Sequence, residues 1–111
     1  MITVNILMTA EDRVKELKVT GHADFSAHGS DIVCSAVSVL TQTALLGLVE
    51  VAELDLKYCI KEGFLSFSIP DIDESDKKLK ACAIIDTMVM GLKNIEENYS
   101  PYIRLIVKKE V

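Results

Sequence analysis

The first twenty residues alternate between apolar and polar positions, which is the pattern of strands with one buried face. Apolar residues occupy the even positions of 2–8, and a second alternation runs from Glu16 to Val19. A polar segment from Ala10 to Arg13 separates the two runs. Alternation with a period of two predicts a strand, and a short polar connection predicts that neighbouring strands pair. We therefore expect a β-hairpin over residues 1–20.

A glycine-bounded segment follows, and after it comes a long uncharged stretch. Gly21 and Gly29 bracket a segment that we expect to form a loop, because glycine tolerates unusual backbone angles. Ser30 and Asp31 are both good N-cap residues. The residues after them predict a long helix that runs to about Leu54.

This uncharged stretch, Ile32 to Val49, is 18 residues long and so reaches the lower limit for a transmembrane helix. Polar residues such as Ser35, Thr41 and Gln42 interrupt it, and a bilayer would leave their polar groups facing hydrocarbon. We therefore expect a helix that lies on a sheet, with its other side covered by a second helix or a second subunit. The prediction is a homodimer that makes no contact with a membrane.

A second hairpin is predicted in the middle of the chain. Alternating residues at 56–61 and 65–69 predict two strands, and Glu62 and Gly63 supply the tight turn between them. Pro70 follows the second run and ends it, because proline cannot donate to a strand ladder.

A second helix and a final strand complete the predicted order. The acidic segment Asp71–Asp76 is suited to cap a helix and to place negative charge at its start. Apolar residues at helical spacing from Leu79 to Ile95 predict that helix, which we expect to end before Pro101. Alternation over 103–108 predicts the last strand.

The resulting order ββαββαβ predicts an α+β two-layer sandwich, in which both helices pack on one face of a mixed or antiparallel sheet. No linker or low-complexity segment interrupts the sequence, so we expect a single domain over residues 1–111. The 111 residues are 50% hydrophobic and 26% charged, the balance of a globular domain. A chain of this length can build a core without disulfide or metal staples.

Net charge and the N-terminus limit the partners and the compartment. Twelve basic and 17 acidic residues give a net charge of −5, which argues against direct nucleic-acid binding and suits a basic protein partner. The N-terminus has no basic region before its apolar residues and reaches charges at Glu11 and Asp12, so we expect no signal peptide. The prediction is a cytoplasmic protein without a cofactor.

Three cysteines at irregular spacing, Cys34, Cys59 and Cys82, form no CxxC pair. Neither a disulfide framework nor a structural zinc site is indicated, and reduced thiols are expected. Cys59 and Cys82 have no histidine nearby in the sequence, and we assign them no chemistry.

Cys34 and His22 are the candidates for nucleophilic chemistry. Cys34 is expected in the first turn of the long helix, where unpaired N–H groups and the helix dipole stabilise a thiolate. His22 lies in the loop that feeds this helix, where it can take the thiol proton and later protonate a leaving amine. The helix amides, including that of Cys34, would hold an acyl oxyanion. Together these features predict acyl transfer by a Cys/His dyad.

Other interpretations of the same residues stay open. Cys34 can be a small core residue and His22 a surface residue of a loop. His22, His28 and Cys34 can instead be three ligands of a catalytic zinc, although two of them lie on a loop rather than on one rigid element. Asp31 suits either an orienting role toward the histidine or an N-cap, and Ser38 suits helix packing.

A motif over residues 21–38 adds to this reading. It consists of Gly21-His22-Ala23, then Gly29, then Asp31-Ile32-Val33-Cys34, then Ala36-Val37-Ser38. The motif resembles the signature of the bacterial ribosomal-processing cysteine protease Prp family, and the chain length and element order agree with that family throughout.

The resemblance implies a homodimeric cytoplasmic peptidase that removes an N-terminal extension from large-subunit ribosomal protein twenty-seven and cuts after an aromatic residue. It implies that His22 and Cys34 form the catalytic dyad, with Asp31 and Ser38 at further motif positions. It also implies that a loop hinged at glycines, here Gly21 and Gly29, moves to admit substrate. A basic ribosomal substrate agrees with the negative net charge.

Two other functions are compatible with the sequence. A non-catalytic ribosome-associated binding module would dock a basic protein on the loop and the acidic surface, with an incidental dyad. A zinc-dependent hydrolase would use His22, His28 and Cys34 as ligands and would be sensitive to chelators.

Overall fold

The predicted order ββαββαβ is confirmed in the part of the chain that the structure, a computed structural model, describes. That part comprises residues 1–21 and 28–111, without the side chains of 28–31. The elements are β1 (Ile2–Met8), β2 (Val14–Thr20), α1 (His28–Glu50), β3 (Lys57–Lys61), β4 (Phe64–Ser68), α2 (Ser75–Asn98) and β5 (Ile103–Lys109).

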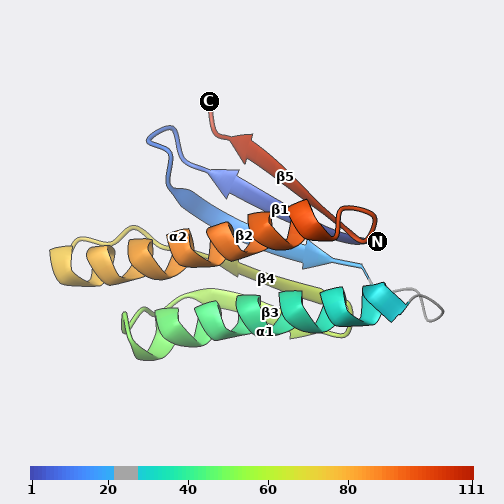
Figure 1. Ribbon diagram of the computed structural model, residues 1–111. Coiled ribbons are helices and arrows are strands. Elements are labelled where there is room, and N and C mark those ends of the chain that lie inside the picture. The colour runs from blue at the N-terminus through green and yellow to red at the C-terminus, as the bar shows by residue number, and fades with distance from the viewer. Residues whose placement is uncertain (22–27) are drawn as a thin grey trace.

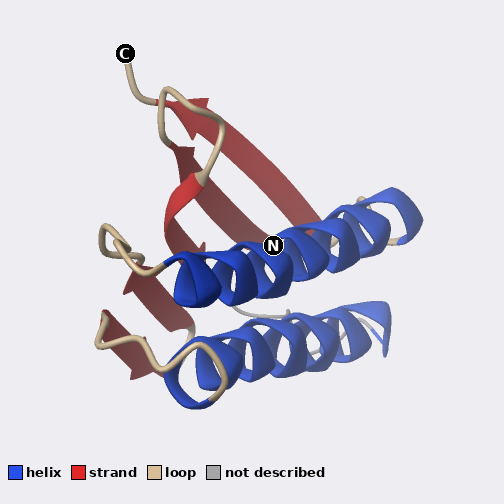
Figure 2. Cartoon of the chain, turned by 90° about the vertical axis from the view of Figure 1, so that its left-hand side faces the viewer, coloured by secondary structure: helices blue, strands red, loops and turns tan. Residues whose placement is uncertain are grey.

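The two helices form one layer and the sheet forms the other, as Figures 1 and 2 show. The strand order is β3-β4-β2-β1-β5. β1 pairs antiparallel with β2 and parallel with β5, so the sheet is mixed. The α+β two-layer prediction is therefore correct, and both helices lie on the same face of the sheet.

The core lies between the layers and follows the predicted parity of the strands. The even positions of β1 from Ile2 to Ile6 are at most 3% exposed, and Leu17 and Phe67 on neighbouring strands are equally buried. The helices add fully buried side chains, among them Leu48 from α1 and Leu92 from α2. Apolar burial of this kind is the main force that holds the helical layer on the sheet.

The helices run antiparallel and approach closely at two glycines. Gly91 of α2 lies against Leu40 of α1, and Gly47 of α1 lies against Ile84 of α2. A Cβ atom at position 91 would come within 2.8 Å of the Leu40 Cδ2 atom. The absence of a side chain there lets the helices pack at short range.

The limits of α1 differ from the prediction at both ends. The helix begins at His28, two to three residues before the expected N-cap, and ends at Glu50, four residues before Leu54. At its end Glu53 has a φ of 56°, and the Leu54 N–H donates to the Leu48 carbonyl oxygen at 2.9 Å. A left-handed residue followed by such a bond stops a helix. Glutamate is not the residue type that signals this cap, so the sequence did not reveal it.

The acidic segment before α2 does not cap the helix with a side chain, contrary to the prediction. The N-cap residue is Glu74, which has an extended backbone and whose side chain makes no capping hydrogen bond. Asp76 lies in the first turn, where a carboxylate is favoured by the helix dipole. The predicted charge effect therefore stands, whereas the predicted side-chain cap is wrong.

The uncharged stretch of α1 serves as a layer of the domain. By length and composition alone the helix from Ile32 to Glu50 could cross a membrane. In this fold its side chains at Val33, Val37 and Leu45 lie in the core with the strands. The polar Thr41 is also buried, and its hydroxyl donates to the Val37 carbonyl oxygen at 2.8 Å. Burial against the sheet thus accounts for one apolar side of the helix.

Candidate active site

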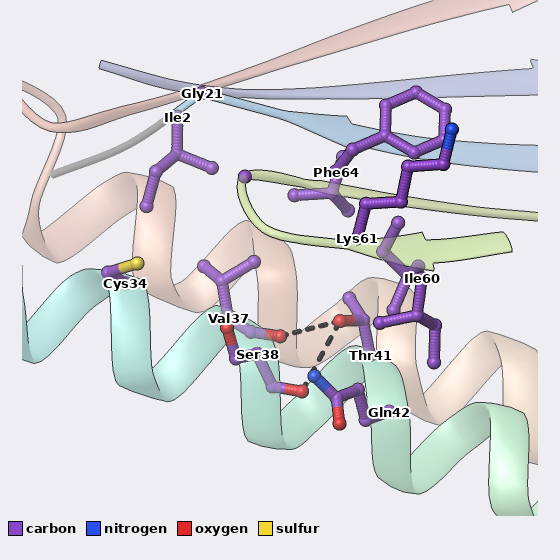
Figure 3. A pocket seen from close by; sticks show the side chains of 13 residues that line it. Ile2, Gly21, Cys34, Val37, Ser38, Thr41, Gln42, Ile60, Lys61 and Phe64 are labelled. Atoms are coloured by element: carbon purple, nitrogen blue, oxygen red, sulfur yellow. Dashed lines mark hydrogen bonds between the residues drawn. The ribbon is translucent and has the colours of Figure 1, made fainter.

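A small pocket lies between the N-terminal half of α1 and the hairpin of β3 and β4, and Cys34 lines it (Figure 3). Its volume is about 90 Å³, comparable with the space that a few water molecules occupy. The lining residues are Ile2, Val19, Gly21, Cys34, Val37, Ser38, Thr41, Gln42, Ile60, Lys61, Gly63, Phe64 and Leu65.

One wall of the pocket is a single face of α1. Cys34, Ser38 and Thr41 are spaced at i, i+4 and i+7, which places them on the same side of a helix. Cys34 and Ser38 are both half-buried, one turn apart. The structure therefore brings the predicted nucleophile together with one of the two predicted supporting residues. The Thr41 hydroxyl is bonded within the helix and is not free for a ligand.

The environment of Cys34 differs from the prediction in one respect. Because α1 begins at His28, Cys34 is the seventh residue of the helix and lies in its second turn. The first four N–H groups of a helix lack partners within it, and the N–H of Cys34 is beyond them. The dipole effect also falls off within the first turn. The expected first-turn position of Cys34, and the thiolate stabilisation expected from it, are therefore wrong, and the use of the Cys34 amide as an oxyanion donor stays a prediction.

The opposite wall comes from the sheet, at the point where β2 ends. The N–H of Gly21 donates to the carbonyl oxygen of Gly63, in the turn between β3 and β4, at 3.1 Å. Gly21 has a φ of 105°, and a Cβ atom there would collide with the carbonyl oxygen of Met1. Only glycine fits this position without strain. Gly21 thus borders the pocket, while its predicted role as a hinge stays a prediction.

The polar groups at the pocket are few. Lys61 is the charged residue among the described lining residues, and no described carboxylate joins it. Gln42 is exposed, and its amide makes no hydrogen bond within the part of the chain that is described. A thiol, a hydroxyl, an amide and an ammonium group therefore surround a partly apolar hollow. These groups can form hydrogen bonds with a ligand, and the apolar side chains beside them can contact it.

Several predicted site residues belong to the segment before α1 or to the first residues of this helix. His22 lies outside the described residues. His28, Gly29 and Asp31 belong to α1 by their backbone. Among the described residues no group of three or more His, Cys, Asp or Glu could hold a metal ion. Because the zinc hypothesis includes the histidine at 22, it stays an untested alternative.

Part of the pocket was missed in the sequence. Gln42 is at i+8 from Cys34, so the helical period could have revealed it. Ile60 and Lys61 offered no comparable signal, because their place depends on the order of strands β3 and β4 in the sheet. The three cysteines are free, as predicted, and Cys59 and Cys82 do not line this pocket.

Comparison with known proteins shows which protein family this chain belongs to. A family model described as cysteine protease Prp matches residues 1–104. The chain belongs to the Prp family of cysteine proteases. The matched segment includes Cys34 and every other lining residue of the pocket. The resemblance seen over residues 21–38 is thereby confirmed, and the protein is a cysteine protease.

Two Prp relatives resemble the chain over almost its full length. The ribosomal processing cysteine protease Prp of Staphylococcus aureus is 33% identical over 111 residues, which cover 97% of this chain and 100% of that protein. The protein of the same name from Bacillus subtilis is 28% identical over 107 residues, covering 95% of this chain and 96% of that protein.

Solved structures of a Prp protease share the fold. The crystal structure of the S. aureus protease in complex with a substrate peptide has a TM-score of 0.84 and 28% identity. The same protease with a covalently linked product peptide has a TM-score of 0.83 and 29% identity. Each comparison covers 97% of this chain and 100% of the other.

Proposed function

We propose that this protein is an endopeptidase that removes the N-terminal extension of large-subunit ribosomal protein twenty-seven and cuts after an aromatic residue. Cys34 is its nucleophile, and His22 is the general base and then the general acid. The observation that carries this proposal is the half-buried thiol of Cys34 at a pocket that also holds the Ser38 hydroxyl and the Gln42 amide. The S. aureus relative with a covalently linked product peptide supports covalent chemistry of this kind.

The position of Gly21 supports the pairing of the dyad. Gly21 lines the same pocket as Cys34, and His22 is the next residue in the chain. The other end of the segment enters α1 at His28, less than two turns before Cys34. The described residues on either side of 22–27 are therefore a lining residue of the pocket and the first residue of the helix that carries Cys34, which supports a pairing of His22 with Cys34.

The reaction follows from these two groups. His22 takes the thiol proton, the Cys34 Sγ atom attacks the scissile carbonyl carbon, and the amide nitrogen leaves with that proton. The product is a thioester on Cys34 and a free amine. His22 then removes a proton from water, the resulting hydroxide attacks the thioester, and the sulfur leaves and regains a proton. Asp31 and Ser38 support the dyad, and no cofactor takes part.

Mass spectrometry of the extended ribosomal protein after incubation tests the proposal. The wild type should make one cut near the substrate N-terminus, and addition of a chelator should not change it. Cys34→Ala should lower the rate by about 10⁴-fold or more, the scale of losing a nucleophile. The matched control is Cys59→Ala, which removes a thiol outside the pocket and should cleave at the normal rate.

Three results would contradict it. Undiminished cleavage by Cys34→Ala would exclude the nucleophile, and loss of cleavage with chelator would favour the zinc hydrolase. Intact substrate that co-purifies with the wild type would favour the non-catalytic binding module.

A homodimer in the cytoplasm is part of the proposal. Ile32, Val39 and Leu46 repeat every seven residues on α1 and are 55%, 66% and 63% exposed. Leu79 and Met90 of α2 are each 72% exposed. Exposed apolar side chains on one helical layer favour a protein partner, and a second copy is the one we propose.

Light scattering should give twice the chain mass, and Val39→Glu with Leu46→Glu should give a monomer. A wild-type monomer at micromolar concentration would contradict this.

A further inference from the structure

A second and larger groove lies at the other end of the molecule. Its volume is about 640 Å³, and it shares no described lining residue with the Cys34 pocket. The β1–β2 turn, the connection from β4 to α2, and the first half of α2 form it. Because the helices are antiparallel, α2 begins at the end of the domain where α1 finishes, far from Cys34 (Figure 1).

The groove combines an apolar floor with a charged rim. Ile69 and Ile72 from the connection are half-buried, and Ile85 of α2 is 3% exposed. Five carboxylates and three basic side chains line the same groove, so its formal charge is −2. By contrast, the Cys34 pocket carries no described carboxylate and one lysine.

The ion pairs at this end leave the negative charge in excess. Lys15 pairs with Glu110 at 2.8 Å, and Asp12 pairs with Lys109 at 2.8 Å. These pairs neutralise one base and one acid of the groove, which leaves four carboxylates against two basic groups.

The carboxylates that remain are available to a partner. The side chains of Asp71, Asp73 and Asp86 are all exposed and make no hydrogen bond or ion pair within the described chain, and Asp71 acts on Lys15 only through charge attraction. They border an apolar floor, so a basic segment that binds here can be attracted by the carboxylates and can pack an apolar side chain beside them. The groove therefore fits a segment that has Lys or Arg side chains together with an apolar residue.

We propose that this groove is an exosite for a basic segment of the substrate protein. An apolar side chain of that segment packs on the floor, and its Lys or Arg side chains face Asp71, Asp73 and Asp86. The inference rests on the proposed function, because a ribosomal protein substrate supplies the basic segment. Docking a remote part of the substrate raises the concentration of its N-terminal extension at Cys34 without touching the scissile bond.

The test compares two substrates that contain the same cleavage sequence. One is the full ribosomal protein, and the other is a short peptide that spans only the cleavage site. The variant is Asp71→Asn with Asp73→Asn and Asp86→Asn. It should lower kcat/KM for the full protein by about five- to tenfold at low salt, mainly through KM, and leave the peptide unaffected. The wild-type rate on the full protein should fall with added salt, and the variant should lose most of that dependence.

A matched control separates the groove from the general charge of the protein. Glu50→Gln with Asp55→Asn and Glu97→Gln makes the same change in charge outside the groove and outside the Cys34 pocket. This control should cleave the full protein at close to the wild-type rate. If control and groove variant lose the same activity, or if neither loses any, the exosite is wrong.

The outcomes distinguish the exosite from the proposed function. One outcome excludes the exosite but keeps the proposed function: the wild type cleaves the peptide, and the groove variant cleaves the full protein with the same kcat/KM as the wild type. Binding of the uncleaved full protein to Cys34→Ala gives a readout without turnover. The same three substitutions in that background should weaken binding five- to tenfold, and unchanged binding would overturn the exosite.

Discussion

The carboxylate of Glu96, on α2, accepts a hydrogen bond of 2.5 Å from the backbone N–H of Leu105, on β5. β5 lies at the edge of the sheet and pairs there with β1. An edge strand offers unpaired backbone groups to other chains, and proteins commonly cover such groups. Glu96 thus ties the helical layer to the sheet and covers one donor of the free edge.

Removal of this acceptor should destabilise the protein. Glu96→Ala leaves a partly buried N–H without its partner, and we expect a loss of about 1–3 kcal/mol in the free energy of unfolding. Glu96→Gln keeps an acceptor oxygen and should lose less. Urea unfolding followed by circular dichroism measures both. Equal stability of wild type and Glu96→Ala would show that water replaces the carboxylate.

Leu48 and Leu46 form a matched pair for the core of α1. Leu48 is fully buried and Leu46 is 63% exposed, two residues apart on the same helix. Leu48→Ala should cost about 2–5 kcal/mol, because it removes buried methyl groups and leaves a cavity. Measured at a protein concentration low enough to keep both variants monomeric, Leu46→Ala should change the free energy of unfolding by less than about 0.5 kcal/mol. Similar effects at the two positions would contradict the placement of α1 on the sheet.

Gly21 should tolerate no side chain. Gly21→Ala would place a methyl group against the carbonyl oxygen of Met1 at a φ of 105°, and we expect a loss of more than about 1 kcal/mol. Peptide cleavage should fall as well, since this residue lines the Cys34 pocket. Gly47→Ala is the control, because its new methyl group would lie 3.3 Å from the Ile84 Cδ1 atom inside a helix. Alanine has a higher helix propensity than glycine, which offsets this contact. The free energy of unfolding of Gly47→Ala should therefore stay within about 1 kcal/mol of the wild-type value.

The ion pair between Lys15 and Glu110 predicts a small effect at high pH. The hydrogen bond from the Lys15 ammonium to the Glu110 carboxylate, and then their charge attraction, raise the pKa of Lys15 above 10.5. A raised pKa in the folded state gives stability that is present at neutral pH and is lost as pH rises through that pKa. The difference in unfolding midpoint between wild type and Lys15→Met should therefore shrink above pH 10.5. Because both side chains are exposed, the difference at neutral pH should be slight. A difference that grows at high pH would contradict the pairing.

Local periodicity was enough to predict the elements of this fold. Alternation over residues 2–8 and helical spacing from Leu79 to Ile95 are properties of neighbouring residues, and both appear as predicted. The limits of α1 depended instead on particular backbone angles, such as the left-handed Glu53, for which the residue type gives no signal.

The candidate site was predictable only where it lies on one element. Cys34 and Ser38 are one helical turn apart, so their common face follows from the sequence. Ile60 and Phe64 reach the same pocket because β4 pairs with both β3 and β2. Pairings between distant strands are set by the whole fold, and a single sequence does not reveal them.

The parallel pairing of β1 with β5 also determines the order in which the molecule can be completed during synthesis. Ile2 pairs with Ile103, and its N–H donates to the carbonyl oxygen of Tyr102 at 2.9 Å. Domains fold as units while the chain emerges from its N-terminus, and contacts between distant residues form slowly. Ile2 lines the Cys34 pocket, and its strand, β1, gains its second neighbour, β5, only after residues 103–109 have been made. A nascent chain that stops before Ile103 has the nucleophile but an unfinished sheet beneath it.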